Sequence, residues 1–334
     1  MEKTGFGVNR IGILTSGGDA PGMNAAIRGA VRTAQCLGIQ CVGIRHGYAG
    51  LINGDFTMMD ESDVSGITKR GGTMLYTARS KEFQTPEGLK RAVDTCTYMG
   101  IDGLITIGGD GTFRGALELA QRGIKVIGIP CTIDNDIGCT SYTIGFDTAC
   151  NTAINAVDRL SDTMQSHERC SVVEVMGHRT GYLALNVGIA TGATITLIPE
   201  VSYDFERDVV GRIRTARLAG RTHFMVIVAE AMEPVHTIAD KINQATGIET
   251  RVTALGHVQR GGDPLMRDRV TATSMGNRAV MLLAQGKGSR VVAMDGDKLI
   301  DIDIEEALAM EKEFDMETYK MFTALTFLDR DILD

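Results

Sequence analysis

Two carboxylates that lie two residues apart, Asp134 and Asp136, carry the clearest chemical potential in this chain. They follow an apolar run, Lys125 to Ile129, that is typical of a buried strand; Pro130 ends it because proline has no N–H to give to a sheet. Ligands bind at this carboxyl edge of open α/β sheets. One carboxylate of such a pair can take a proton while the other helps to hold a metal ion. A structural turn rich in Asp and Asn is the alternative interpretation.

Two glycine-rich loops accompany this turn. One, residues 108–112, contains Asp110 and follows a second predicted buried strand, residues 103–107. With the Asp134 turn it predicts one phosphate and metal site. The other loop, residues 15–24, joins a predicted strand to a predicted helix, where free helix N–H groups can bind an anion. It matches neither the dinucleotide fingerprint nor a Walker A loop with its lysine, so alone it is a weak indication.

Several basic residues lie beside the loops and strand ends. Arginine forks match phosphate geometry, so together with a histidine they favour a phosphorylated substrate. Each one alone is more often a solvated or paired surface charge. The basic residues are Arg79, Arg169, Arg179, Arg251, Arg260 and His257.

The elements that must position these residues alternate between strands and helices along the whole chain. This order predicts parallel sheets with helices on both faces. The site loops fall in both halves of the sequence, which predicts a cleft between two similar α/β lobes. Among the expected helices are residues 63–69, 147–164, 204–218 and 304–314.

Composition sets limits on the class of protein. A chain of 334 residues is long enough for two domains with ample cores. The net charge of −8 argues against nucleic acid as a main partner, and no apolar run reaches the roughly 18 residues of a membrane span. The start lacks an apolar signal-peptide core. The seven cysteines contain no C-x-x-C pair, so we expect reduced thiols of a cytoplasmic protein rather than zinc ligands.

Five stretches closely resemble the bacterial-type 6-phosphofructokinase family, in order from about Ile11 to about Met294. They are residues 16–24, 108–112, 132–136, 176–177 and 255–262. The combination is very specific. It implies an α/β fold of two doubly wound lobes with the active site in the cleft between them. The implied nucleotide-binding lobe is 1–145 with a return segment 259–309, and the fructose 6-phosphate lobe is 146–258 with a C-terminal segment 310–334.

The resemblance also implies roles for individual residues. Asp134 matches the base that takes the proton of the sugar 1-hydroxyl. Asp110 matches the Mg²⁺ contact, with Asp136 close enough to assist. The positions that match the ATP site are Gly18, Tyr48, Arg79, Ser80, Gly109, Asp110, Gly111, Thr112 and Gly115. Those that match the fructose 6-phosphate site are Thr132, Ile133, Asp134, Arg169, Met176, Gly177, His178, Glu230, Arg251, His257, Val258, Gln259 and Arg260.

The implied activity is the phosphorylation of fructose 6-phosphate to fructose 1,6-bisphosphate with MgATP, the committed step of glycolysis. Family members are usually homotetramers, and Arg169 and Arg251 match arginines that reach the substrate of the neighbouring subunit. Gly111 is the residue typical of ATP users. Cys131 stands where ATP users usually have Gly and pyrophosphate users Lys, and His178 replaces an Arg near the transferred phosphate. A pyrophosphate-dependent phosphofructokinase and a catalytically silent sugar-phosphate sensor therefore stay open as alternatives.

A second, regulatory site of the family is only partly kept. Arg28, Arg32 and Arg221 match its cations, but Glu61 stands where an Arg is usual. Other charged positions of that site are also lost, at Ser161, Thr194 and Ala219. The resemblance therefore implies a weak response to ADP and phosphoenolpyruvate.

Overall fold

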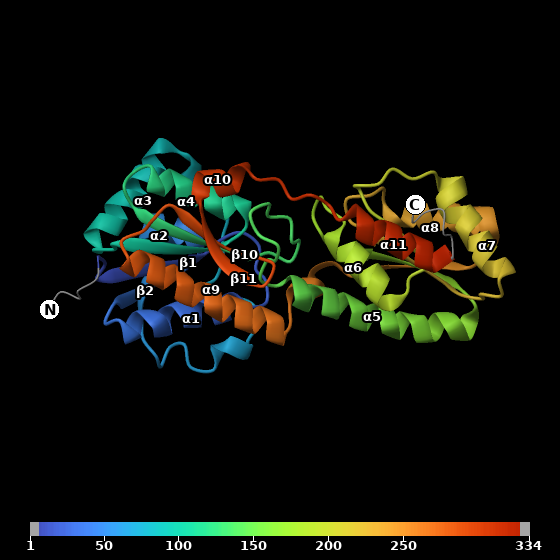
Figure 1. Ribbon diagram of the computed structural model, residues 1–334, viewed down its shortest axis with the longest axis horizontal. Coiled ribbons are helices and arrows are strands. Elements are labelled where there is room, and N and C mark those ends of the chain that lie inside the picture. The colour runs from blue at the N-terminus through green and yellow to red at the C-terminus, as the bar shows by residue number, and fades with distance from the viewer. Residues whose placement is uncertain (1–6, 328–334) are drawn as a thin grey trace. The chain divides into compact units, whose positions relative to one another are not determined.

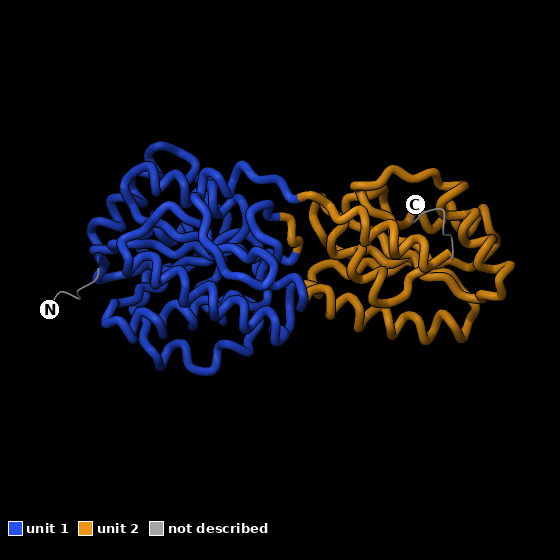
Figure 2. The backbone as a smooth tube through the Cα atoms, viewed as in Figure 1, with its two compact units in different colours: residues 1–133, 137–148, 260–312 blue, residues 134–136, 149–259, 313–334 orange. Residues whose placement is uncertain are grey.

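The computed structural model describes residues 7–327, and the chain divides into two compact units (Figure 2). Unit 1 contains the chain up to residue 133, residues 137–148 and residues 260–312. Unit 2 contains residues 134–136, residues 149–259 and the chain from residue 313 onward. The short turn that carries Asp134 thus belongs to unit 2, although the strand before it belongs to unit 1. The assignment of one unit to ATP and the other to fructose 6-phosphate stays a prediction.

Unit 1 is built on a seven-stranded sheet with the order β11-β10-β5-β4-β1-β2-β3. The five inner strands are parallel, and the two outermost strands pair antiparallel with their neighbours. The strands are β1 (Arg10–Thr15), β2 (Gln40–Ile44), β3 (Phe56–Met59), β4 (Gly103–Gly108), β5 (Lys125–Pro130), β10 (Arg290–Asp295) and β11 (Lys298–Asp303).

Helices cover both faces of this sheet (Figure 1). Two long helices, α1 and α9, pack against each other on one face, while α3, α4 and α10 lie on the other. The α-helices of unit 1 are α1 (Met23–Cys36), α2 (Gly47–Asn53), α3 (Pro86–Tyr98), α4 (Asp110–Ala120), α9 (Met266–Ala284) and α10 (Ile304–Ala309). Two short 3₁₀ helices, η1 (Ile67–Lys69) and η2 (Glu82–Gln84), lie in the connection between β3 and α3.

Unit 2 has a four-stranded, fully parallel sheet with the order β7-β8-β6-β9. Its strands are β6 (Cys170–Val175), β7 (Ile195–Leu197), β8 (Phe224–Ala229) and β9 (Thr250–Ala254). The chain enters the unit along α5 (Phe146–His167) and leaves it through the 3₁₀ helix η4 (Gly256–Arg260). The other helices are α6 (Tyr182–Thr191), the π-helix η3 (Phe205–Gly211), α7 (Arg212–Leu218), α8 (Val235–Thr246) and α11 (Met316–Phe327).

The predicted α/β class, with two lobes and mainly parallel sheets, is confirmed, but several predicted elements were wrong. Residues 63–69 form turns and only one short 3₁₀ helix, and residues 204–218 divide into a π-helix followed by α7. The helix expected over 304–314 ends at Ala309, because the next residues run extended against Gly138; a Cβ on Gly138 would collide with the Met310 carbonyl. The elements α2, β3 and β11 were not predicted.

Two general properties bear on the site. Among residues 7–327, no helix combines the length and apolar character that a membrane crossing requires. All seven cysteines of the sequence lie in this described range as free thiols, and six of them are buried.

Candidate active site

The loop between β4 and α4 presents a helix N-terminus and an exposed carboxylate. β4 is buried along its whole length, and α4 begins two residues after it at Asp110. A Cβ atom on Gly109 or Gly111 would meet no other atom within 4 Å, so the space around both glycines is open. The predicted nucleotide residues 109–112 therefore gather at one helix N-terminus, where free N–H groups favour a phosphate.

The glycine loop after β1 lies beside this helix. The Thr112 hydroxyl donates to the carbonyl oxygen of Ser16 (3.0 Å), and the Thr77 hydroxyl donates to that of Gly17 (2.6 Å). Gly17 has a φ of 87°, in the left-handed region that favours glycine. The loop that contains Gly18 thus contacts the first turn of α4, where Thr112 lies.

Tyr48 and Gly115, both predicted to line the nucleotide site, pack against each other. Tyr48 is buried, its hydroxyl donates to the carbonyl oxygen of Thr112 (2.5 Å), and its ring stacks on Phe83 at 4.1 Å. Burial raises the pKa of Tyr48 far above its ordinary value, so the hydroxyl stays a neutral donor. A Cβ on Gly115 would lie only 2.7 Å from the Tyr48 ring, so glycine permits this contact. Tyr48 thus packs against α4 at the point where Gly115 lies in that helix.

Two of the predicted cations lie in unit 1. Arg79 is exposed, and its neighbour Ser80 accepts a hydrogen bond (3.1 Å) from a backbone N–H of η2. Arg260 lies against the glycine loop: its guanidinium donates to the carbonyl oxygen of Asp19 (3.3 Å), and a Cβ on Gly18 would collide with it. Arg260, which the resemblance assigns to the sugar phosphate, therefore lies beside the glycine loop that follows β1.

The Asp134 turn forms a compact polar cluster in unit 2. Asp134 is 8% exposed, and Asn135 adopts a left-handed backbone with a φ of 52°. Side-chain ligand atoms of Asp134, Asp136 and His178 all lie within 4.8 Å of one another. The His178 Nδ1 is 3.9 Å from a carboxylate oxygen of Asp136. Sequence reasoning placed His178 near the transferred phosphate but did not foresee that it would adjoin both carboxylates.

Two side chains that follow the neighbouring strands β8 and β9 hold the turn after β6 through hydrogen bonds. Glu230 follows β8, and its Oε1 accepts hydrogen bonds from the N–H groups of Gly177 (3.3 Å) and His178 (2.7 Å). Gln259, which is fully buried, accepts a bond from the N–H of Met176 (3.3 Å). The structure thus brings these five predicted residues together at the carboxyl ends of neighbouring strands.

Four further predicted substrate residues are divided between the units, with Thr132 and Ile133 in unit 1 and His257 and Val258 in unit 2. Thr132 is half-buried, and its carbonyl oxygen accepts a hydrogen bond from the Thr143 hydroxyl (2.7 Å). Ile133 is buried, whereas His257 and Val258 are exposed on η4. Of these four side chains, those of His257 and Val258 are therefore the most accessible to a soluble ligand.

Arg169 and Arg251 lie at the opposite, amino end of the unit 2 sheet. Both pair with Glu249, and the distance from Arg169 Nε to Glu249 Oε2 is 2.8 Å. Hydrogen bonding to Arg169, the largest cause, holds the pKa of Glu249 below its ordinary value. Arg169 precedes β6 and Met176 follows it, so roughly 20 Å of strand separates them. One chain does not bring Arg169 to the turn that holds Met176.

The predicted effector cations are only partly available. Arg32 on α1 forms an ion pair with Glu61, and the two side chains are 39% and 69% exposed. Arg28 is half-buried on the same helix, and Arg221 is exposed after α7. The acidic replacement noted in the sequence therefore neutralises one of the arginines that remain.

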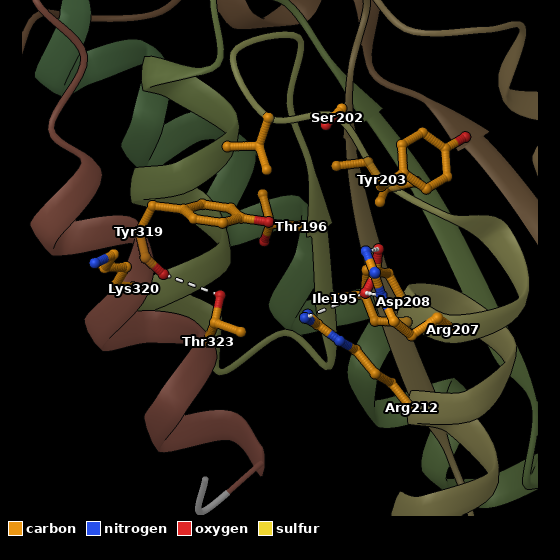
Figure 3. Close-up of a pocket in the computed structure, with 12 residues that line it drawn as sticks. Ile195, Thr196, Ser202, Tyr203, Arg207, Asp208, Arg212, Tyr319, Lys320 and Thr323 are labelled. Carbon is orange, nitrogen blue, oxygen red and sulfur yellow. Dashed lines mark hydrogen bonds and ion pairs between the residues drawn. The ribbon is translucent and has the colours of Figure 1, made fainter. Parts of the chain in front are cut away.

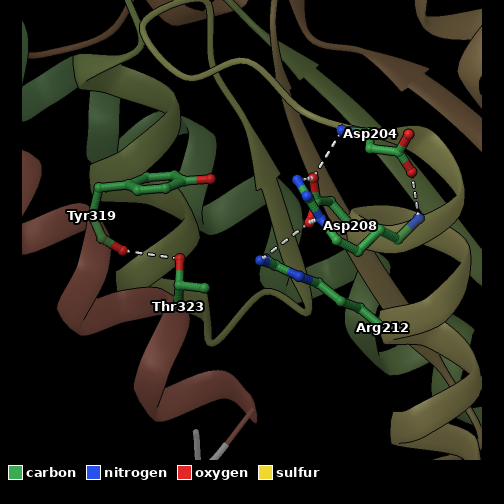
Figure 4. A network of polar contacts seen from close by, with 6 residues as sticks. Asp204, Asp208, Arg212, Tyr319 and Thr323 are labelled. Carbon is green, nitrogen blue, oxygen red and sulfur yellow. Dashed lines mark hydrogen bonds and ion pairs between the residues drawn. The ribbon is translucent and has the colours of Figure 1, made fainter. Parts of the chain in front are cut away.

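A cavity of about 200 Å³ in unit 2 is lined by none of the predicted site residues. It lies between β7, the loop 201–203, η3 and α11 (Figure 3). Asp208 on its wall binds Arg207 through two hydrogen bonds (2.8 and 2.7 Å), lies 3.7 Å from Arg212 and accepts a bond from the N–H of Asp204 (Figure 4). Bonding to Arg207 lowers the pKa of Asp208. Arg207 and Arg212 are already paired with Asp208, so this cavity is not part of the candidate active site.

The fold and the loops at its strand ends describe a phosphotransferase of the α/β class. The family model for phosphofructokinase matches residues 10–283, and the chain belongs to this family, as its motifs predicted. It is 49% identical over 320 residues to the ATP-dependent 6-phosphofructokinase of Clostridium tetani, covering 96% of this chain and all of that one. It is 51% identical over 316 residues to the enzyme of that name from Clostridium botulinum, covering 95% and 99% of the two chains.

Solved structures agree with this assignment. Phosphofructokinase from Saccharomyces cerevisiae superposes with a TM-score of 0.85 at 33% identity; the match covers 97% of this chain and 48% of the longer yeast chain. A pyrophosphate-dependent phosphofructokinase from Marinobacter aquaeolei gives a TM-score of 0.84 at 19% identity, covering 96% and 92%. The latter likeness concerns the fold alone.

Proposed function

We propose that this protein transfers the terminal phosphoryl group of ATP to the 1-hydroxyl of fructose 6-phosphate, as an ATP-dependent 6-phosphofructokinase of glycolysis. The observation that carries the proposal is the near-complete match, at about half identity, to curated enzymes of that name. The motif loops found at the carboxyl ends of the strands support it, because that edge is where α/β sheets bind ligands.

In phosphoryl transfer the protein mainly positions the two substrates and neutralises the charge on the phosphate oxygens. Asp134 is the proposed base, which accepts the proton of the 1-hydroxyl as that oxygen bonds to phosphorus. We assign Arg79 and the N-terminus of α4 to the stabilisation of phosphate oxygens, because a guanidinium and free helix N–H groups both favour phosphate. The turn held by Glu230 and Gln259 is proposed to orient the sugar phosphate.

The donor groups in the structure fit Mg²⁺, which prefers oxygen ligands. Asp110 is an exposed carboxylate in the first turn of α4, and Asp136 lies in the cluster with Asp134 and His178. We assign Asp110 as the metal contact and Asp136 as the assisting group. Neutralisation of charge on the phosphate oxygens is what a bound Mg²⁺ supplies.

Two positions favour ATP over pyrophosphate as the donor. The open space around Gly111 leaves room for the nucleoside side of ATP. Cys131 is 1% exposed, and burial, together with the nearby Asp268 and Asp19, raises the pKa of its thiol well above the ordinary value. A buried neutral thiol offers no positive charge to pyrophosphate, unlike the lysine usual in pyrophosphate users.

We further propose a homotetramer whose active sites are shared between subunits. The support is the position of Arg169 and Arg251 at the amino end of the unit 2 sheet, away from the turn that holds Met176 in the same chain. We expect the enzyme to work in the cytoplasm, since seven free thiols suit a reducing compartment.

The test is a coupled assay of fructose 1,6-bisphosphate formation from fructose 6-phosphate, ATP and Mg²⁺. Turnover that is lost in Asp134→Asn and in excess EDTA would support the proposal. Saturable binding of fructose 6-phosphate without turnover by the unmodified protein would instead identify the silent sugar-phosphate sensor.

A further inference from the structure

Asp268, in the first turn of α9, is a fully buried carboxylate outside every motif that the sequence singles out. Its two oxygens accept four hydrogen bonds from one short segment, residues 142–148. One oxygen binds the Tyr142 hydroxyl (2.5 Å) and the N–H of Gly145 (2.7 Å); the other binds the N–H (3.0 Å) and hydroxyl (2.5 Å) of Thr148. Asp268 therefore fixes both ends of this segment.

The segment in turn holds the end of β5, the strand that leads to Asp134. The N–H of Ile144 donates to the carbonyl oxygen of Pro130 (3.1 Å), and the Thr143 hydroxyl donates to that of Thr132 (2.7 Å). These bonds reach the chain within two residues of Asp134. The backbone of residues 142–148 thus joins the hydrogen bonds of Asp268 to those that hold the chain beside the proposed base.

The same segment packs tightly against the glycine loop after β1. A Cβ on Gly22 would lie 2.5 Å from the Ile144 side chain, and one on Gly145 would lie 2.7 Å from Ala20. The guanidinium of Arg267 covers the Tyr142 ring at 4.1 Å. The segment therefore has little room to move while Asp268 holds it.

Burial of a carboxylate away from water is unfavourable unless hydrogen bonds within the protein replace those it made to water. Burial raises the pKa of Asp268, whereas the hydrogen bonds from Thr148, Tyr142 and Gly145 act in the opposite direction. Removal of the carboxylate would leave buried donors without a partner. A side chain with this arrangement fixes backbone geometry better than an apolar one of similar size.

We propose that Asp268 is a positioning residue for the phosphoryl transfer: through residues 142–148 it sets the end of β5 and thereby the Asp134 carboxylate. This rests on the proposed function. Misplacement of a reacting group by about 1 Å can cost on the order of a hundredfold in rate. Because the network reaches the base rather than a substrate contact, its loss should act on kcat more than on KM.

The experiment compares Asp268→Asn with wild type and with Asp301→Asn. Asp301 is a matched control: it is a mostly buried carboxylate on β11 of unit 1, it pairs with Arg278 on α9 and Arg290 on β10, and neither arginine is among the predicted site residues. Asn keeps the shape of the side chain but replaces an acceptor oxygen by an NH₂ group, which faces donors. Thermal unfolding is measured for each protein, and steady-state kinetics are then measured below the lowest of the unfolding temperatures.

We expect Asp268→Asn to lower kcat about ten- to a hundredfold, with both KM values within about threefold of wild type. Asp301→Asn should unfold at a lower temperature but keep kcat within about twofold, because it disturbs stability alone. A kcat for Asp268→Asn within twofold of wild type, or an equal fall in both variants, would overturn the positioning role.

Tyr142→Phe keeps the test valid if Asp268→Asn does not fold, because it removes one hydroxyl and leaves the carboxylate. We expect a smaller fall in kcat, about three- to tenfold, with unchanged KM values. An unchanged kcat in Tyr142→Phe together with a Thr148→Val variant would then overturn the role. A wild-type protein without any turnover would overturn the proposed function itself, an outcome that is distinct from wild-type-like variants.

Discussion

Enzyme assembled from Asp134→Asn and Arg169→Ala subunits should be more active than either parent. Each parent lacks a different part of the site. We propose that Arg169 binds the substrate of a neighbouring subunit. The active site of an Arg169→Ala subunit, which keeps Asp134, would then receive an intact Arg169 from a neighbouring Asp134→Asn subunit. Hybrid assemblies would then contain complete sites that neither parent can form.

The expected size of the effect follows from the two parents. Loss of Arg169 removes a charge-assisted contact of about 1.5–3 kcal/mol, which corresponds to a rise of roughly 10- to 150-fold in KM for fructose 6-phosphate. At a substrate concentration near the wild-type KM, Arg169→Ala then keeps roughly 1–20% of the wild-type rate and Asp134→Asn about 1% or less. In a random one-to-one mixture about one quarter of the sites would be complete, because each site needs Asp134 from one subunit and Arg169 from its neighbour, each with a probability of about one half.

The assay measures fructose 1,6-bisphosphate formation after the two proteins are co-expressed or refolded together. A matched control mixes Asp134→Asn with the double variant Asp134→Asn/Arg169→Ala, in which no complete site can form. The expected result is about a quarter of wild-type activity in the test mixture and none above the parents in the control. A test mixture no more active than the average of its parents would refute shared sites.

Two further predictions concern the proposed base and regulation. Asp134→Asn should lower kcat by about 10²–10⁴-fold, or about 3–5 kcal/mol of barrier, because the amide cannot accept the proton; the affinity for MgATP should stay unchanged. Steady-state kinetics and calorimetry measure these two quantities. A near-wild-type kcat would exclude Asp134 as the base. ADP and phosphoenolpyruvate should have little effect on initial rates at sub-saturating fructose 6-phosphate, since Glu61 already pairs with Arg32; sigmoidal kinetics relieved by ADP would contradict this.

Much of the fold could be predicted because its signals are local. The buried runs that form β4 and β5 are apolar and end in glycine or proline beside acidic loops, so both strands and their functional edge could be read from the residues alone. Hairpin strand β11 was missed although the turn before it contains Gly296, with a φ of 58°, between two aspartates. This turn chemistry was a usable signal.

Other features depend on contacts between distant parts of the chain. Residues 47–53 contain two glycines and still form α2, because packing overrides weak propensity. The early end of α10 depends on a close approach to Gly138, which lies far away in the sequence. No local pattern could reveal these contacts.

In the candidate site, too, some residues could be predicted from local motifs and others depend on contacts between distant parts of the chain. The loops with Asp110 and Asp134 carry short motifs, so their residues could be named in advance. The link from Asp268 to the end of β5 has no sequence signature, because a lone aspartate in a helix is ordinarily a solvated surface residue. The pairing of both Arg169 and Arg251 with Glu249 likewise needed coordinates.

The proposed function rests on the use of ATP by this chain to phosphorylate fructose 6-phosphate. The most direct measurement compares ATP with pyrophosphate as the donor in one coupled assay, with Mg²⁺ and saturating fructose 6-phosphate. We predict rapid turnover with ATP and little or none with pyrophosphate, since Gly111 leaves room for a nucleoside and Cys131 supplies no cation. Faster turnover with pyrophosphate than with ATP would contradict the account.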